Sequence, residues 1–139
     1  MDANYIKARD IMREPLIIRL DCSVREAAEI ILNQGVGALV VVENEKPIGV
    51  VTKRDLLWFL THSGRDPGVE SVDRIMSKNL ISVDPDADIT VVIEKMLDNN
   101  ISHIVVIEDN KLVGIISDRE IIELFQNILE YEKSIAKTG

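Results

Sequence analysis

Two short stretches of the chain combine a hydroxyl side chain with an acidic side chain three residues later. Thr52 precedes Asp55, and Ser117 precedes Glu120, at an offset of 65 positions. Each pair follows an apolar run and precedes apolar residues at helical spacing, which predicts a junction between a strand and a helix. Backbone N–H groups and side chains converge at such junctions, and small ligands often bind there. The two junctions are therefore the best candidates for a functional site.

The same spacing also has a purely structural interpretation. A hydroxyl followed three residues later by an acid forms a capping box, in which the two side chains bind backbone N–H groups at the start of a helix. Glutamate is preferred as the acid, so Ser117/Glu120 is expected to be the better box. The residues alone leave capping and ligand binding open, and Thr52 could serve both.

Cationic side chains lie beside both junctions. Lys53, Arg54 and Arg119 fall in a first helical turn, where a positive charge is mildly unfavourable against the helix dipole. This position favours an anionic partner, although a solvated surface explains it equally well. His103 opens an apolar strand and is either a packed, hydrogen-bonded residue or a ligand contact.

The junctions belong to a longer internal repeat. Residues 24–60 match residues 89–125 without a gap, and Ile11-Met12 matches Ile75-Met76 at an offset of 64. A long period that occurs only twice indicates a duplicated subdomain and not a solenoid. The predicted boundaries are 7–62 for the first repeat, 63–71 for a linker, 72–129 for the second repeat, and 130–139 for a helix end and tail.

Each repeat is predicted to run strand, helix, strand, strand, helix. In the first repeat, Ser23 begins a helix that ends at Gly35, and the residues after Glu43 turn the chain between two strands. The predicted segments are 16–19, 23–35, 38–42, 48–51 and 53–60 in the first repeat, and 80–83, 89–97, 103–107, 112–116 and 118–135 in the second.

The fold class that follows is α/β. Each repeat forms a three-stranded sheet with two helices on one side, and the two sheets are expected to pack together about a pseudo-twofold axis. The predicted apolar helix faces include Leu32, Leu97, and the group Leu56, Leu57 and Leu60. Trp58 and Phe59 lie off that stripe; they suggest an exposed interface, unless Phe59 packs on the linker.

Composition excludes several classes of protein. The net charge of −8 argues against bulk binding to nucleic acid or to an anionic membrane. Cys22 is the only cysteine, so no internal disulfide is expected, and no apolar run is long enough to span a membrane. The stretch Met1–Tyr5 does not resemble a signal peptide. A cytoplasmic location is expected.

Enzymatic activity is not expected. The sequence contains no Walker loop, no nucleophile beside a plausible base, and no cluster of metal-ligating residues. No metal and no required cofactor are predicted.

The tandem arrangement resembles the cystathionine-β-synthase (CBS) domain pair, or Bateman module. The resemblance covers about residues 8–125 and is carried by Asp10-Ile11-Met12 and Arg74-Ile75-Met76, by the runs 39–43 and 104–108, and by the two Gly-x-x-hydroxyl junctions. It implies a regulatory module that binds an adenosine-containing ligand (AMP, ADP, ATP, S-adenosylmethionine or NAD) in clefts between the repeats.

The resemblance also implies roles for individual residues. The acid of each junction, Asp55 or Glu120, would accept the ribose hydroxyls, and Thr52 or Ser117 would add a polar contact. Adenine would lie against backbone at the first two strands of each repeat. The cations would face phosphate groups. The full set of expected site residues is Thr52, Asp55, Ile17, Ile18, Gly37, Ala38, Lys53, Arg54, Ser82, His103, Ser117, Arg119 and Glu120.

The two sites depart from the family pattern in different ways. Glu120 stands where the family usually has aspartate, and its extra methylene is expected to move the carboxylate outward. Ile18 stands where the family often has a hydroxyl residue, whereas the second repeat keeps Ser82. We rank the Thr52/Asp55 site first, because losing the ribose acid should cost more than losing one neutral hydroxyl.

The implied function is regulatory, as in energy sensing. The ligand would bind a homodimer, and the homodimer would act on an unidentified target protein. The alternative is a structural dimerisation or adaptor protein whose nucleotide clefts are vestigial.

Overall fold

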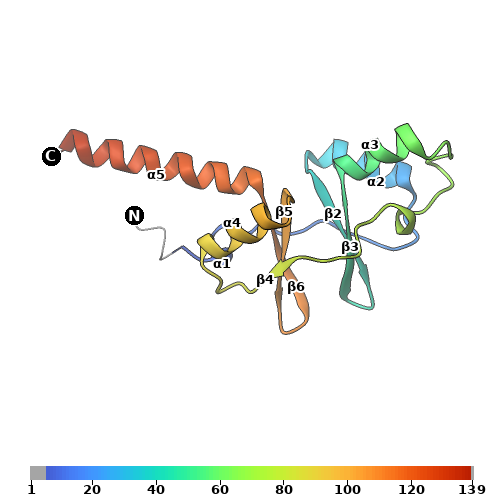
Figure 1. Ribbon diagram of the computed structural model, residues 1–139, viewed down its shortest axis with the longest axis horizontal. Helices are drawn as coiled ribbons and strands as arrows, with labels where there is room; N and C mark the ends of the chain where they lie inside the picture. The colour runs from blue at the N-terminus through green and yellow to red at the C-terminus, as the bar shows by residue number, and fades with distance from the viewer. Residues whose placement is uncertain (1–5, 139) are drawn as a thin grey trace. The chain divides into compact units, whose positions relative to one another are not determined.

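The computed structural model describes residues 6–138, which form two three-stranded sheets and their helices (Figure 1). The predicted α/β class with a duplicated sheet-and-helix repeat is confirmed. The stretch Met1–Tyr5, whose sequence does not resemble a signal peptide, lies outside the described residues.

The elements follow the predicted order in both repeats. They are α1 (Ala8–Ile11), β1 (Ile17–Ile18), α2 (Val24–Gln34), β2 (Ala38–Glu43), β3 (Lys46–Thr52), α3 (Lys53–His62), the 3₁₀ helix η2 (Val72–Arg74), β4 (Ser82–Val83), α4 (Ile89–Asp98), β5 (His103–Glu108), β6 (Lys111–Ser117) and α5 (Asp118–Thr138). The last helix is the longest, and within unit 1 it extends well past α4 (Figure 1).

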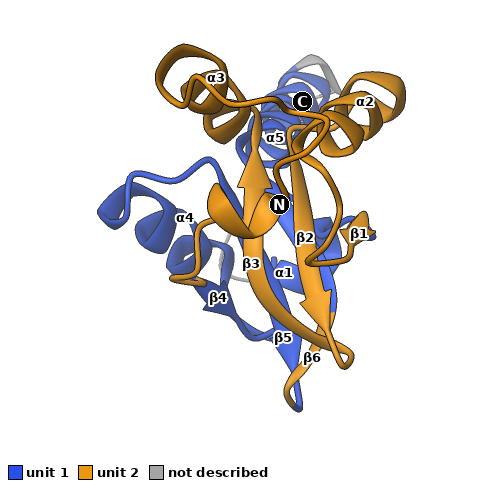
Figure 2. Cartoon of the chain, turned by 90° about the vertical axis from the view of Figure 1, so that its right-hand side faces the viewer, with its two compact units in different colours: residues 1–14, 81–109, 113–139 blue, residues 15–80, 110–112 orange. Residues whose placement is uncertain are grey.

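The chain divides into two compact units that are not continuous in sequence (Figure 2). Unit 1 contains the residues up to Glu14, then 81–109, and the chain from Val113 onward; unit 2 contains 15–80 and 110–112. The helix α1, which opens the first repeat, therefore belongs to unit 1 with the second repeat. In the same way η2 belongs to unit 2. The predicted boundaries follow the repeat in the sequence, whereas the units take their opening segments from the opposite repeats.

In unit 2 the register of the sheet positions the first junction. The strand β1 runs parallel to β2, with Ile17 opposite Val40, and β2 runs antiparallel to β3, with Ala38 opposite Thr52. Asn44 and Glu45 both have positive φ, as a tight hairpin turn between twisted strands requires. The start of β2 and the end of β3 therefore lie side by side at the N-terminus of α3.

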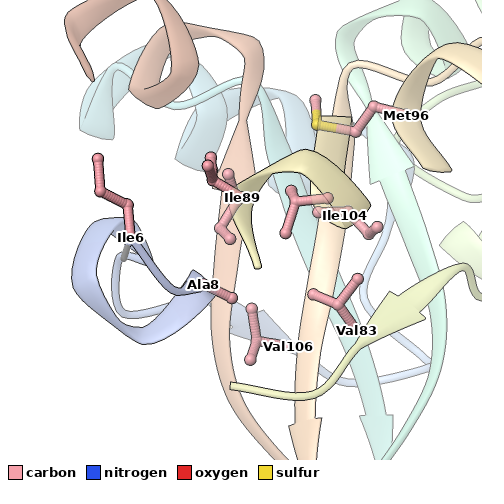
Figure 3. Close-up of a cluster of buried hydrophobic side chains, with 9 residues drawn as sticks. Ile6, Ala8, Val83, Ile89, Met96, Ile104 and Val106 are labelled. Atoms are coloured by element: carbon pink, nitrogen blue, oxygen red, sulfur yellow. The ribbon is translucent and has the colours of Figure 1, made fainter. Parts of the chain in front are cut away.

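Unit 1 repeats this arrangement with its own apolar core (Figure 3). The strand β4 pairs with β5 in parallel, with Ser82 opposite Val105, and β6 flanks β5 on the other side. Buried side chains from β4, β5, β6, α1 and α4 form one cluster, which includes Ala8, Val83, Ile89, Met96, Ile104, Val106 and Ile116. The scarcity of aromatic residues explains why this core is aliphatic.

Two glycines allow the exchanged segments to approach the sheets closely. A Cβ placed on Gly114 would lie 2.6 Å from Met12 Sδ, and a Cβ on Gly49 would lie 2.6 Å from Met76 Sδ. Each methionine follows the helix that opens a repeat, and each glycine lies in the last strand of the same unit. Only glycine leaves room for this contact, which explains the Gly of both junction motifs.

The helix ends follow local rules that the sequence shows. Ser23 Oγ accepts a hydrogen bond of 3.0 Å from the Glu26 N–H at the start of α2, and Gly35 ends that helix in the left-handed conformation with φ of 66°. Among residues 6–138, no helix combines the length and apolar character needed to cross a membrane.

The predicted apolar faces are partly wrong. Leu32 and Leu97 are 79% and 75% exposed. On α3, Leu57 and Leu60 are also exposed, and of the three predicted leucines only Leu56 packs against the core. Phe59 is the buried residue of α3, at 2% exposure. Adjacent stripes on these helices are both apolar, and periodicity alone does not distinguish the stripe that faces the sheet.

Candidate functional site

The junction in unit 2 is held together by Thr52 and Asp55. The Asp55 carboxylate accepts hydrogen bonds from the Thr52 N–H at 2.8 Å and from the Thr52 hydroxyl at 3.0 Å, both through Oδ2. In return, the Asp55 N–H donates to Thr52 Oγ1 at 3.3 Å. This is a complete capping box at the start of α3. Within residues 6–138, no hydrogen bond or ion pair is seen at Asp55 Oδ1.

Backbone at the start of β2 borders this junction. The Lys53 N–H donates a hydrogen bond of 3.1 Å to the Gly37 carbonyl, and Ala38 lies opposite Thr52 in the sheet. Five of the predicted site residues, Gly37, Ala38, Thr52, Lys53 and Asp55, are therefore brought together at one end of the unit 2 sheet. Ile17 and Ile18 lie further along, opposite Val40 and Val41; Ile18 is buried, and Ile17 is 58% exposed.

The two cations of this junction are solvent-exposed. Lys53 and Arg54 occupy the first turn of α3, and neither forms an ion pair with another described residue. Their charges therefore remain available to a ligand near the helix N-terminus.

The junction in unit 1 has a related but different geometry. Glu120 Oε1 accepts hydrogen bonds from the Ser117 N–H and the Ser117 hydroxyl, each at 2.9 Å. The Ser117 hydroxyl in turn accepts from the Arg119 N–H at 3.2 Å, one residue earlier than in a reciprocal box. The expectation that Ser117/Glu120 forms the better box is therefore wrong, because the complete box is that of Thr52 and Asp55.

The Glu120 carboxylate is buried, contrary to the expected outward shift. Its side chain is 7% exposed, and its Oε2 is shielded from solvent without a hydrogen-bond partner among the described residues. Arg13 Nη1 lies 3.5 Å from Oε2 as an ion-pair partner, on a side chain that is 53% exposed. The longer side chain is therefore buried beside Arg13, which lies in the segment that follows α1, and does not extend outward.

Backbone next to His103 borders the junction of unit 1. The Asp118 N–H donates to the Ser102 carbonyl at 2.9 Å, which repeats the Lys53–Gly37 contact of unit 2. His103 Nδ1 lies 3.1 Å from Ser102 Oγ. Ser82, further along the sheet, accepts a hydrogen bond of 2.9 Å at its carbonyl from Lys95.

Arg119 is directed along its own helix. Its Nε donates to Glu123 Oε1 at 3.1 Å, an ion pair between positions one turn apart. This cation is therefore less available to a ligand than Lys53 or Arg54.

A cavity of about 580 Å³ lies beside Glu120 within unit 1. Its walls come from α1, α5 and the residue Ile6, and they combine three carboxylates and one amide with three apolar side chains: Ile6, Asp10, Ile11, Glu120, Glu123, Leu124 and Asn127. No group of three or more metal-ligating side chains with suitable geometry occurs in the described part of the chain.

Sequence reasoning missed Arg13. Arg13 and Glu120 are far apart in the chain, and they belong to different sequence motifs. The available signal was a difference between the repeats, because Arg13 follows Ile11-Met12 while Ser77 follows Ile75-Met76.

Comparison with known proteins gives a family match at both repeats. The family described as CBS domain matches residues 8–62 and 70–127, which is most of the chain. The pattern of two tandem copies agrees with the duplicated sheets and with the two junctions.

Solved structures of similar proteins carry adenosyl ligands. The CBS domain pair of protein MJ0100, solved in complex with 5′-methylthioadenosine and S-adenosyl-L-methionine, is 27% identical, with a TM-score of 0.80 over 88% of this chain and 97% of that chain. The CBS domain protein PAE2072 from Pyrobaculum aerophilum, complexed with AMP, is 28% identical, with a TM-score of 0.77 over 83% of this chain and 89% of that chain.

Curated relatives are longer than this chain. A homoserine O-acetyltransferase from Methanosalsum zhilinae is 35% identical over 132 residues, which are 89% of this chain and 25% of that protein. The chain spans less than half the length of the first curated relatives that it matches.

Proposed function

Because the chain belongs to the CBS domain family, we propose that it is a regulatory module that binds an adenosine-containing ligand at the Thr52/Asp55 junction. The candidate ligands are AMP, ADP, ATP, S-adenosylmethionine and NAD. Binding would be transmitted to an oligomer or to a partner protein. The proposed location is the cytoplasm, and the proposed role is not catalytic, with no required cofactor or metal.

The observation that carries this proposal is the state of the Asp55 carboxylate. One of its oxygens, Oδ2, holds the cap, while Oδ1 makes no hydrogen bond or ion pair within the described residues. A carboxylate oxygen can accept from two neighbouring hydroxyls, and a ribose presents two such hydroxyls on adjacent carbons. Capping and ribose binding are therefore compatible at this residue.

Neighbouring groups suit the rest of such a ligand. The backbone of Gly37 and Ala38 borders the junction, and the adjoining apolar strands offer a surface for an adenine ring. Lys53 and Arg54 lie exposed in the first turn of α3, whose N-terminus attracts anions. A nucleotide phosphate would gain from both features, so AMP or ATP is a stronger candidate here than a neutral nucleoside.

A homodimer formed through the helices is part of the proposal. Leu32 and Leu60 on α2 and α3 are exposed, and so are their repeat equivalents Leu97 and Phe125 on α4 and α5. Large exposed apolar side chains at equivalent positions of both units indicate a surface that becomes covered. A ligand that fits one arrangement of the dimer better than another would shift the population towards it.

A structural adaptor with vestigial sites remains the alternative function. Both junction acids form helix caps, and this role explains their positions without any ligand. The adaptor account predicts no response of the protein to adenosyl compounds.

A thermal-shift screen against the five ligands separates the two accounts. A ligand at one hundred times its dissociation constant should stabilise the protein by about 2.7 kcal/mol, which raises the melting temperature by several degrees. Asp55→Ala should remove most of this response. The matched control is Ser23→Ala, which removes a cap of α2 in the same unit and should leave the response intact. No shift with any ligand would favour the adaptor.

A further inference from the structure

Arg13 and Ser77 occupy equivalent positions in the two units. The backbone of Arg13 forms a two-way bridge with Ile115, with N–H to carbonyl distances of 2.9 Å in both directions. Ser77 forms the same bridge with Val50, at 2.9 and 3.0 Å. Val50 and Ile115 are themselves equivalent in the repeat. Each bridge joins the segment after a methionine to the strand that leads into a junction.

Only one of these equivalent positions carries a side chain that reaches the junction acid. Arg13 Nη1 lies 3.5 Å from Glu120 Oε2 and forms an ion pair with it. The other oxygen, Oε1, accepts both hydrogen bonds from Ser117. Ser77 carries no charge, and Asp55 has no ion-pair partner among the described residues. Asp55 is also half-buried, whereas Glu120 is buried, at 6% exposure.

We propose that Arg13 acts as an intramolecular competitor for the ribose-binding position of Glu120, so that the two sites of the chain are unequal. The inference rests on the proposed function for the identity of the ligand. A ribose can reach Oε2 only after the guanidinium moves away. Since the Arg13 side chain is about half exposed, its charge can transfer to water without being left buried and unpaired.

The consequence is a difference in affinity between the units. The apparent dissociation constant of a site equals its intrinsic value divided by the open fraction, so a site that is open one-tenth of the time binds about tenfold more weakly. The unit 2 site would fill first. The unit 1 site would respond only at higher ligand concentration, which would give one chain two thresholds.

The binding test isolates unit 1 by using Asp55→Ala as the background. Calorimetric titrations with AMP and with S-adenosylmethionine compare this variant with Asp55→Ala/Arg13→Ser. Opening the site should tighten binding by about tenfold or more. The reciprocal change, Ser77→Arg in the otherwise wild-type chain, should weaken binding at unit 2. Unchanged or weaker binding after Arg13→Ser would overturn the proposal, and weaker binding would identify Arg13 as a ligand contact.

A second measurement does not depend on any ligand. Carbodiimide-driven labelling of carboxylates with an amine, read by peptide mass spectrometry, reports the accessibility of Glu120 and Asp55 in the same sample. Glu120 should label more slowly than Asp55 in the wild type and faster after Arg13→Ser. Arg9→Ser is the matched control, because Arg9 lies on the same segment but pairs with Asp86 at 2.6 Å.

The two measurements distinguish the possible failures. If Glu120 labels as fast as Asp55 in the wild type, or if Arg9→Ser exposes it as much as Arg13→Ser does, the proposed competition is wrong whatever ligand binds. A different result would be that no variant binds either ligand, although Arg13→Ser, and not Arg9→Ser, exposes Glu120. In that case Arg13 does cover the carboxylate, and it is the proposed ligand-binding function that is wrong.

Discussion

The Asp55 carboxylate accepts both of its hydrogen bonds from Thr52 through a single oxygen. This relationship, with distances of 2.8 and 3.0 Å, fixes the start of α3 and keeps the second oxygen out of the cap. A residue that caps a helix and also binds a ligand must divide its acceptors in this way. Glu120 also accepts both of its hydrogen bonds from Ser117 through one oxygen, but its second oxygen is buried and lies 3.5 Å from Arg13 Nη1.

The first prediction concerns the cap itself. Thr52→Ala removes the hydroxyl that accepts from the Asp55 N–H, and should lower the free energy of unfolding by about 1 kcal/mol, a common value for a lost N-cap. Urea denaturation followed by circular dichroism measures this change. An unchanged midpoint would mean that the box contributes nothing to the stability of α3.

The second prediction concerns the close approach at Gly114. An added Cβ would lie 2.6 Å from Met12 Sδ and 2.9 Å from Met12 Cγ, so Gly114→Ala should destabilise the protein by roughly 1–3 kcal/mol through overpacking. Met12→Ala removes both of those atoms and leaves Met12 Cβ, which would lie 2.9 Å away. Because most of the overlap is relieved, the double variant should be more stable than the sum of the two single changes predicts. Simple additivity in denaturation experiments would show that this contact is not the cause.

Some features of this structure can be predicted from the sequence, and others cannot. Caps and turns depend on residues close in the chain, so Ser23, Gly35 and the Thr52/Asp55 box could be placed from local rules. The choice between adjacent apolar stripes depends on packing. This is why Leu32 was predicted on an apolar face but is exposed, and why the sequence left the position of Phe59 open. Pairing of Arg13 with Glu120 depends on the exchange of segments between the units, which leaves no local signal.

The third prediction concerns the thiol of Cys22. Burial raises its pKa, and the nearby Glu26 carboxylate adds to the effect. Because the thiolate is the reactive form, alkylation by iodoacetamide near neutral pH should be slower in the native protein than in urea. Glu26→Gln should speed the native reaction, and equal rates in native and unfolded protein would contradict the raised pKa.

The same pKa shift has a consequence for stability. A thiol whose pKa is raised in the folded state contributes stability below its unfolded pKa, and this contribution is lost as the pH rises through the folded pKa. The free energy of unfolding should therefore fall more steeply with alkaline pH in the wild type than in Cys22→Ser. Parallel pH profiles for the two proteins would show that Cys22 makes no such contribution.

The fourth prediction concerns the helix surface. Leu60 is 68% exposed, so Leu60→Glu should leave the stability of a single chain within about 0.5 kcal/mol while it weakens the proposed dimer. Sedimentation velocity over a range of concentrations measures the association. Glu45→Lys, in the hairpin turn of unit 2, is the control. A wild type that stays monomeric, or a variant that associates as well as the wild type, would exclude this surface.

The central claim is that Asp55 recognises the two ribose hydroxyls, and a double-mutant cycle tests it most directly. Calorimetry would compare the ligand found in the screen with its 2′-deoxy analogue, on the wild type and on Asp55→Ala. A charge-assisted hydrogen bond is worth about 1.5–3 kcal/mol, so the wild type should prefer the ribose form by roughly tenfold or more. At the unit 2 site, the variant should bind both forms equally weakly. Equal affinity of the wild type for the two forms would contradict the account.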